Sequence, residues 1–257
     1  MAIATSPSSP TSAQVTLAAE LSNVARLQAE RDANPILAGA LDRLATWQSR
    51  RLRMTYGDLA KEPRYADAVR FFQTDLYGNR DFARRDADLA RVVPVMVRML
   101  PEAAIAAIAK AVELHALTQT LDRSLLARLP RADVQVSVSD YARAYRRMGK
   151  RAEREHQIQL IGEIGAQLAG FVKKPLLRGA LRMMRQPARL AGFGALHDFL
   201  DRGFVAFGKM GDATEFLATI DEREGALMDA LLGGETAPFP DPLEPRVSGP
   251  RAAEASG

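Results

Sequence analysis

The sequence of 257 residues is long enough for one large domain or two small ones. Its hydrophobic content of 47% and charged content of 26% are ordinary for a globular protein with a sizeable core. Cysteine is absent, which excludes disulfides, thiolate metal ligands and a cysteine nucleophile. No apolar run approaches the roughly 20 residues of a membrane-spanning helix, and the N-terminus lacks a signal-peptide pattern. We therefore expect a cytoplasmic protein.

Hydrophobic residues recur at three- and four-residue steps along most of the chain, which predicts a succession of amphipathic helices. Residues 1–11 are rich in serine and proline and are expected to form a disordered tail. A first helix is predicted from a cap at Ser12 to about Asp32, and a second begins at Pro35, since proline suits the first turn of a helix. Trp47 lies at helical spacing on the second helix and is expected in the core.

Two further helices are predicted over Tyr65–Tyr77 and Asp81–Leu100, and another from Pro101 to about Leu129. The segment Arg131–Ser137 has an alternating, strand-like pattern, but it is too short for a sheet and is interpreted as an extended linker. We therefore expect no sheet in the fold.

A long basic helix is predicted over Asp140–Val172, with Ser137 as a candidate cap. Gly162, Gly165 and Gly170 fall within this helix. Each glycine weakens a helix by about 1 kcal/mol relative to alanine. These positions therefore either permit close helix packing or mark a bend.

The last helices are shorter. Pro175 restarts the chain, and Pro187 is expected to limit the helix after it to about 11 residues. A helix over Ala195–Gly208 follows, and Asp212 with Glu215 has the capping-box pattern of a last helix.

These elements predict an all-α, single-domain bundle of roughly seven to nine helices. The bundle is expected to span residues 12–233. Disordered tails are predicted at residues 1–11 and 234–257, where proline and small or charged residues replace the apolar pattern.

The stretch Phe71–Arg91, FFQTDLYGNRDFARRDADLAR, combines closely spaced aromatic residues with paired charges around a glycine. Asp81 and Arg85, for example, lie four residues apart on one helical face, a pairing that contributes about 0.2–0.5 kcal/mol. One interpretation is a recognition corner, and the other is a structural turn between helices with a buried aromatic plug and a solvated ionic face. The residues that define this corner are Asp75, Gly78, Arg80, Asp81, Arg85 and Asp88.

The pattern FFxxDLYGxRDFxxRDxDLxR within this stretch resembles the signature of a family of uncharacterised, mostly helical bacterial proteins. The resemblance covers a short part of the chain. It implies a helical fold and assigns no activity, so no catalytic residue is expected from it. The matching residues are Phe71, Phe72, Asp75, Leu76, Tyr77, Gly78, Arg80, Asp81, Phe82, Arg85, Asp86, Asp88, Leu89 and Arg91.

Histidines are the best candidates for chemistry in a chain without cysteine. His115 follows Val112 at helical spacing, so it is either a core or boundary residue or a ligand contact. Glu153 and His156 have the E-x-x-H spacing of di-iron bundles, but such a centre needs a second pair, which is missing. We therefore expect neither a metal site nor a cofactor.

Charge is unevenly distributed although the formal net charge is only +4. Basic residues dominate Arg143–Arg189, and acidic residues dominate from His197 onward. The basic surface that we single out alternates cations with leucine and methionine and contains no acid. It comprises Lys173, Lys174, Arg178, Arg182, Arg185 and Arg189.

A basic amphipathic segment of this kind binds an anionic membrane or an acidic protein partner. The alternative is a surface helix whose charges face water or the acidic C-terminal region. Nucleic acid is a less favoured partner, because no recognition motif or aromatic platform accompanies the cations. Homo-oligomerisation is left open.

Two functional hypotheses follow. The first is a non-catalytic, cytoplasmic interaction protein that uses this basic surface. The second is a helical ligand-binding protein or enzyme with an interior pocket near His115 and the Phe71–Tyr77 aromatics. The residues expected to line that pocket are His115, Phe72, Tyr77 and Trp47.

Overall fold

The computed structural model describes residues 11–76, 102–130, 136–190 and 194–243. Within these ranges the regular elements are helices, nine of them α-helices, and no strand occurs, which confirms the predicted all-α class. A 3₁₀ turn, η1 (Leu59–Lys61), precedes α3, and a π-helical turn, η2 (Phe72–Leu76), follows it. The α-helices are α1 (Ser12–Asp32), α2 (Pro35–Thr55), α3 (Ala66–Phe71), α5 (Glu102–Leu126), α6 (Val138–Met148), α7 (Arg151–Val172), α8 (Pro175–Leu190), α9 (Gly194–Met210) and α10 (Thr214–Gly233).

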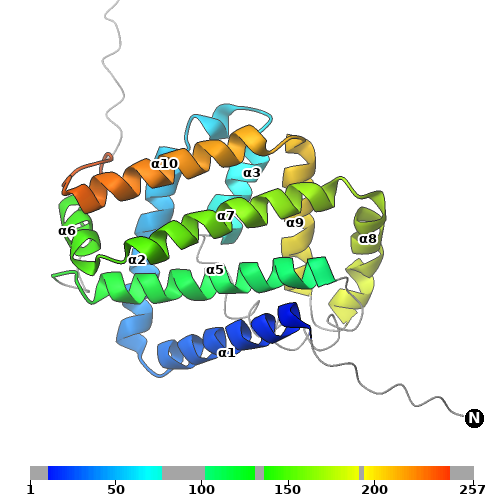
Figure 1. Cartoon of the computed structure of the whole chain (residues 1–257), viewed down its shortest axis with the longest axis horizontal. Coiled ribbons are helices and arrows are strands. Elements are labelled where there is room, and N and C mark those ends of the chain that lie inside the picture. Colours follow the sequence, from blue (N-terminus) through cyan, green and yellow to red (C-terminus); the bar gives the residue numbers. More distant parts are fainter. Residues whose placement is uncertain (1–10, 77–101, 131–135, 191–193, 244–257) are drawn as a thin grey trace, which may run out of the picture.

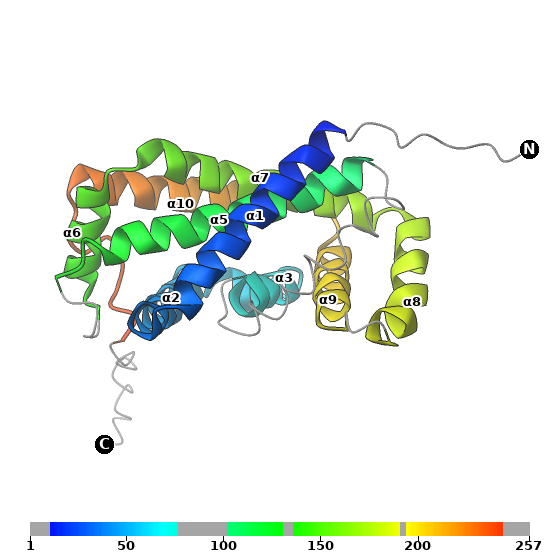
Figure 2. The ribbon, with the colours of Figure 1, turned by 90° about the horizontal axis from the view of Figure 1, so that it is seen from below.

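The helices form two crossing layers. Figure 1 shows the long helices α5, α7 and α10 side by side, with α1 next to α5, while α2, α3 and α9 cross behind them. In Figure 2 the crossing helices are seen nearly end-on, and α8 stands beyond α9 at one end of that layer. Among the described elements, α8 contacts chiefly α9 and to a smaller extent α7.

The first core cluster is built around Trp47, as its helical spacing predicted. Its indole stacks on Tyr141 with ring centroids 4.6 Å apart, and the side chain is 3% exposed. Phe239 packs edge-on against the same indole at 5.8 Å. The predicted end of the folded region at residue 233 was therefore too early, because Phe239 and Leu243 both pack on this cluster.

A second core cluster joins α3, α7, α9 and α10 through the fully buried Phe207 and Phe216. Gly165 lies where α7 meets α10, and a Cβ built there would be 2.4 Å from Leu217 Cδ2. Gly162 and Gly170 have no such neighbour. Of the two roles considered for these glycines, close packing therefore applies to Gly165.

The long helix predicted over Asp140–Val172 was wrong, because the chain turns between α6 and α7. Gly149 adopts φ of 78°, a left-handed value that glycine reaches without strain. Its N–H donates to the Tyr145 carbonyl and so closes the last turn of α6. The new helix then starts at Arg151.

The helix after Pro175 is longer than predicted, since α8 continues through Pro187 to Leu190. Proline at this position removes the hydrogen bond to the Met183 carbonyl. Met183 is 77% exposed, so water can replace the lost donor. The cost of Pro187 is correspondingly small near the end of an exposed helix.

Two predicted caps also differ from the structure. Thr11, and not Ser12, caps α1 by a reciprocal pair of hydrogen bonds with Gln14. Asp212 accepts from the Thr214 backbone N–H at 3.0 Å, while Glu215 accepts from the Tyr65 hydroxyl at 2.8 Å instead of completing a capping box. Two further expectations were met. Pro35 occupies the first turn of α2, and Ser137 caps α6.

Candidate functional site: the α8 surface and the pocket beside α9

Helix α8 carries the predicted basic surface, and it is the most exposed helix of the fold. None of its residues is buried. Leu176 and Leu190 are each 87% exposed and Met183 is 77% exposed. Only Leu177, Leu181 and Ala188 are half-buried, so these three mark the side that faces the rest of the protein.

The exposed residues of α8 fall into two rows. Leu176, Met183 and Leu190 are seven residues apart and therefore lie in line along one flank of the helix. The four arginines recur at steps of four, three and four residues and lie along the other flank. An apolar row and a basic row thus both run along the exposed part of α8, on different flanks. We call them the Leu–Met row (Leu176, Met183 and Leu190) and the arginine row (Arg178, Arg182, Arg185 and Arg189).

A hydrogen bond between α8 and α9 fixes this arrangement. The His197 side chain is buried on α9, and its Nε2 lies 2.8 Å from the Leu181 carbonyl oxygen. Because a carbonyl can only accept, the ring N–H at Nε2 is the donor. Together with Leu177 and Leu181, this bond sets which side of α8 faces inward.

The arginines are only partly neutralised. Arg189 pairs with Asp198 at 3.3 Å, and Arg178 donates to the Val172 carbonyl at 3.3 Å. Within the described ranges, neither Arg182 nor Arg185 has an ion pair or a hydrogen bond. Within the described part of the acidic C-terminal region, Asp198 is the acid that pairs with an arginine of α8.

The fold does pair part of the basic middle with the acidic end, but elsewhere. Arg151 on α7 contacts Asp229 on α10 at 2.7 Å. At the base of α8, the Lys174 ammonium lies 5.7 Å from the centre of the Phe171 ring. Hydrogen bonds from Thr214 lower the pKa of Asp212, and the nearby charge of Lys173 contributes to that shift.

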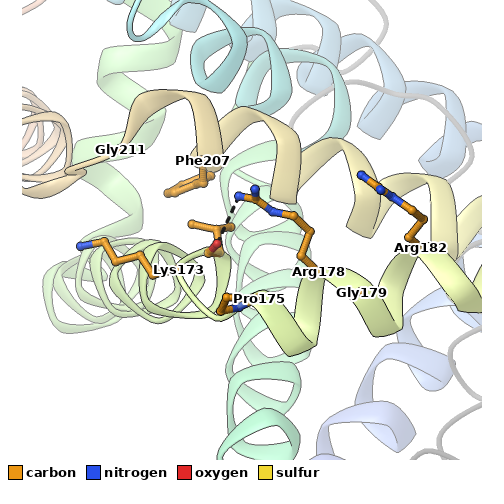
Figure 3. Close-up of a pocket in the computed structure, with 9 residues that line it drawn as sticks. Lys173, Pro175, Arg178, Gly179, Arg182, Phe207 and Gly211 are labelled. Atoms are coloured by element: carbon orange, nitrogen blue, oxygen red, sulfur yellow. Dashed lines mark hydrogen bonds between the residues drawn. The ribbon is translucent and has the colours of Figure 1, made fainter.

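A pocket of about 520 Å³ opens between α8 and α9. Lys173, Arg178 and Arg182 contribute the charge, Val172 and Phe207 form the apolar floor, and none of the described lining residues is acidic. Figure 3 shows the Arg178 side chain crossing from α8 toward α9, with its bond to the Val172 carbonyl drawn dashed.

Gly208 gives this guanidinium its space. A Cβ built on Gly208 would lie 3.2 Å from an Arg178 terminal nitrogen. The absence of a side chain on that turn of α9 therefore lets Arg178 lie close to the helix. Sequence reasoning found the cations but missed Phe207 and Gly208, because their only sequence signal is the spacing of an ordinary helix face.

Of the four residues predicted to share an interior pocket, the three that the structure describes are not brought together. Trp47 belongs to the first core cluster and Phe72 to the second. His115 is half-buried on α5, with its Nε2 2.8 Å from Gln119 Nε2. The cavity that Phe72 lines holds about 30 Å³, room for about one water molecule. Tyr77 lies outside the described residues.

Glu224 lines the same small cavity and forms a buried ion pair. It accepts both guanidinium nitrogens of Arg51 at 2.6 and 3.1 Å and the Tyr56 hydroxyl at 2.8 Å. Burial alone would raise the pKa of Glu224, but the Arg51 charge and these hydrogen bonds outweigh it and hold the pKa below its usual value. The ion pair therefore joins α2 to α10 and has a structural role.

The E-x-x-H pair is not assembled as a metal site. His156 lies 2.6 Å from Glu113 on α5, and Glu153 pairs with Lys150 at 3.5 Å. Among the described residues, no group of three or more potential ligands could hold a metal ion.

None of the helices in the described ranges has the length and apolar character needed to cross a bilayer.

The motif corner lies almost wholly outside the described residues, which omit 77–101. Gly78, Arg80, Asp81, Arg85 and Asp88 are therefore not placed, and Asp75 is described only as part of η2. The two leading aromatics are core residues. Phe71 packs on Phe199 with centroids 5.3 Å apart, and Phe72 packs on Phe207 and Phe216.

Comparison with protein families gives a match over residues 25–238 to the family described as "Domain of unknown function (DUF8198)". The chain belongs to this family. The match contains nearly all of the helical fold, including α8, α9 and the pocket between them. Comparison with curated proteins and with solved structures finds no match for this DUF8198 chain.

Proposed function

We propose that this protein is a non-catalytic interaction protein that docks reversibly on an anionic membrane surface through α8. The observation that carries the proposal is the pair of exposed rows on one helix, the Leu–Met row beside the arginine row. An interfacial helix needs both features, because apolar groups enter the headgroup boundary while cations meet lipid phosphates.

Both rows contribute at a membrane. Each arginine near an anionic surface is worth about 1 kcal/mol, and a large apolar side chain that leaves water is worth about 1.5–3 kcal/mol when fully buried. Three partly inserted side chains and four arginines therefore supply several kcal/mol, enough for reversible and salt-sensitive binding. The anionic inner leaflet attracts basic segments, so the proposal places the protein on the cytoplasmic side of a bacterial membrane.

A membrane suits these rows better than the other partners considered. Nucleic acid would use the arginines and leave the Leu–Met row in water. A second copy meeting α8 against α8 would bring two arginine rows close together. A protein partner usually offers a closely packed apolar centre, whereas the Leu–Met row is one straight line on a projecting helix. An acidic protein is therefore an outcome that the experiment must detect.

Flotation with lipid vesicles at low salt tests the proposal. The parent protein should bind vesicles of phosphatidylcholine with phosphatidylglycerol and not vesicles of phosphatidylcholine alone. Changing Leu176, Met183 and Leu190 to Gln should abolish binding without unfolding the protein, because all three side chains are exposed. Changing Arg178, Arg182 and Arg185 to Ala should weaken it by about a hundredfold, at about 1 kcal/mol for each arginine.

Ile36 supplies the matched control, since it is 82% exposed on α2 and distant in sequence from α8. Ile36→Gln should leave flotation unchanged. The proposal is wrong if the parent protein does not float with anionic vesicles, or if the triple Gln variant floats as well as the parent. Binding to polyglutamate without binding to vesicles would assign the surface to an acidic protein instead.

A further inference from the structure

We infer that the pocket between α8 and α9 is a binding site for the phosphate group of a phosphomonoester. The site goes beyond membrane docking, although Arg178 and Arg182 of the arginine row also line this pocket between α8 and α9. Titration with a soluble ligand in the absence of vesicles tests the site separately. Nothing in the fold or the family match assigns a ligand to it.

The positive charge of the residues that line the pocket favours an anionic ligand. Three cations line the pocket from two segments, Lys173 just after α7 and Arg178 and Arg182 from successive turns of α8. None of the described residues that line the pocket carries a carboxylate, and Arg178 has only a neutral carbonyl as its partner there. Arg182 has no hydrogen-bond or ionic partner within the described ranges. A dianion would therefore gain charge-assisted contacts with the two arginines, neither of which has an acidic partner within the described ranges.

Phosphate fits this set better than a carboxylate does. Guanidinium groups recognise phosphate oxygens through paired N–H donors, and a monoester carries close to two negative charges at neutral pH. Asp212 lies outside the lining, where it interacts electrostatically with Lys173 and accepts hydrogen bonds from Thr214. The charge of Lys173 is thus partly balanced by Asp212, while within the described ranges the charges of Arg178 and Arg182 have no such balance.

The size and floor of the pocket indicate that the phosphate arrives attached to a small organic group. A volume of about 520 Å³ is in the range of small-molecule sites. It exceeds what a phosphate ion fills, and Val172 and Phe207 give the remaining space an apolar floor. Gly208 keeps the wall on the α9 side free of a side chain where Arg178 crosses.

Calorimetric titration of the whole chain with glycerol 3-phosphate at low salt tests the site without vesicles. We expect saturable binding with one site per chain. Arg182→Gln should weaken it about tenfold or more, because a charge-assisted hydrogen bond is lost. Arg185→Gln is the matched control, since it removes the same charge from the same helix but from a residue that does not line the pocket.

Gly208→Ala tests the geometry separately from the charge. The added methyl group would lie 3.2 Å from the Arg178 guanidinium and displace it, so affinity should fall although no charge is removed. Alanine favours helix more than glycine does, so this variant should keep α9 intact. An unchanged affinity in Gly208→Ala would contradict the placement of the phosphate beside Arg178.

Flotation with two kinds of vesicle identifies the source of the phosphate. Phosphatidic acid presents a phosphomonoester, whereas phosphatidylglycerol presents a diester. If the protein prefers phosphatidic acid vesicles and Arg182→Gln removes that preference, the pocket binds a lipid headgroup. If glycerol 3-phosphate binds but the protein shows no such preference, the pocket binds a free ligand. The inference is overturned if glycerol 3-phosphate does not bind, or if Arg185→Gln costs as much affinity as Arg182→Gln. Failure of vesicle flotation alone would leave the titration result standing.

Discussion

Replacing Gly165 by alanine should destabilise the protein, although alanine is the better helix former. A Cβ at this position would lie 2.4 Å from Leu217 Cδ2, 3.2 Å from Cδ1 and 3.4 Å from Cγ. Three atoms of one side chain are crowded at once, so rotation of a single methyl group cannot relieve the contact. Leu217 packs against the second core cluster and must shift as a whole. Such overpacking costs about 1–3 kcal/mol.

Gly162 on the same helix is the matched control, because a Cβ there would meet nothing within 4 Å. Both substitutions gain up to about 1 kcal/mol from helix propensity, so Gly162→Ala should stabilise the fold and Gly165→Ala should not. The difference between the two variants should be about 1–3 kcal/mol, equal to the packing penalty alone. Urea unfolding followed by far-UV circular dichroism measures it, with unchanged m values as the check on two-state behaviour.

A double-mutant cycle separates this contact from other effects. Leu217→Ala removes the atoms that clash, so adding Gly165→Ala to that variant should cost nothing further. Equal stability changes for Gly162→Ala and Gly165→Ala in the parent would refute the packing argument. So would a penalty for Gly165→Ala that survives in the Leu217→Ala background.

Two further predictions concern the interior and the C-terminal segment. Glu224→Gln leaves Arg51 buried without its counter-charge and should cost about 3–5 kcal/mol in the free energy of unfolding at neutral pH. Because the folded-state pKa of Glu224 is lowered, its contribution is present above the unfolded pKa and is lost as pH falls through the folded pKa. Urea unfolding as a function of pH should therefore show the variant and the parent converging in acid, and a constant gap would contradict the pair's role. Phe239→Ala should lower the free energy of unfolding by about 1–3 kcal/mol. It should also alter Trp47 fluorescence, since the two rings lie 5.8 Å apart. An unchanged spectrum and stability would show that the segment around Phe239 does not pack on Trp47 in solution.

The helical class was predictable because its signal is local. Leu44, Leu121 and Leu125 are fully buried, and each belongs to a run with helical spacing. The break at Gly149 was not predictable, because Gly162 and Gly165 carry the same local signal and stay inside α7. What differs is tertiary: both helices contact α5 and α10, and α7 also contacts α8 and α9. The π-helical turn after Phe71 likewise has no distinctive sequence signature.

The candidate site was predictable in its charges and not in its shape. A run of cations without an acid between Lys173 and Leu190 is evident in the sequence. Whether the acidic C-terminal region covers that run depends on distant contacts, and Arg151–Asp229 shows that the acids are partly engaged elsewhere. The pocket required Gly208 and Phe207 from a separate helix, so its geometry follows from the docking of α9 and from no local pattern.

The orientation of α8 is the strongest physical reason to look for a partner on its outer face. Leu177 and Leu181 occupy the inward side, and the bond from His197 to the Leu181 carbonyl fixes that choice. A helix held in this way cannot also bury Met183, which stays 77% exposed in line with Leu176 and Leu190. Scattered exposed apolar residues need no explanation, but a row of three along one flank leaves apolar surface in water that folding alone does not require. An anionic surface that takes up this row and its neighbouring arginines would supply the missing burial and the missing counter-charge together.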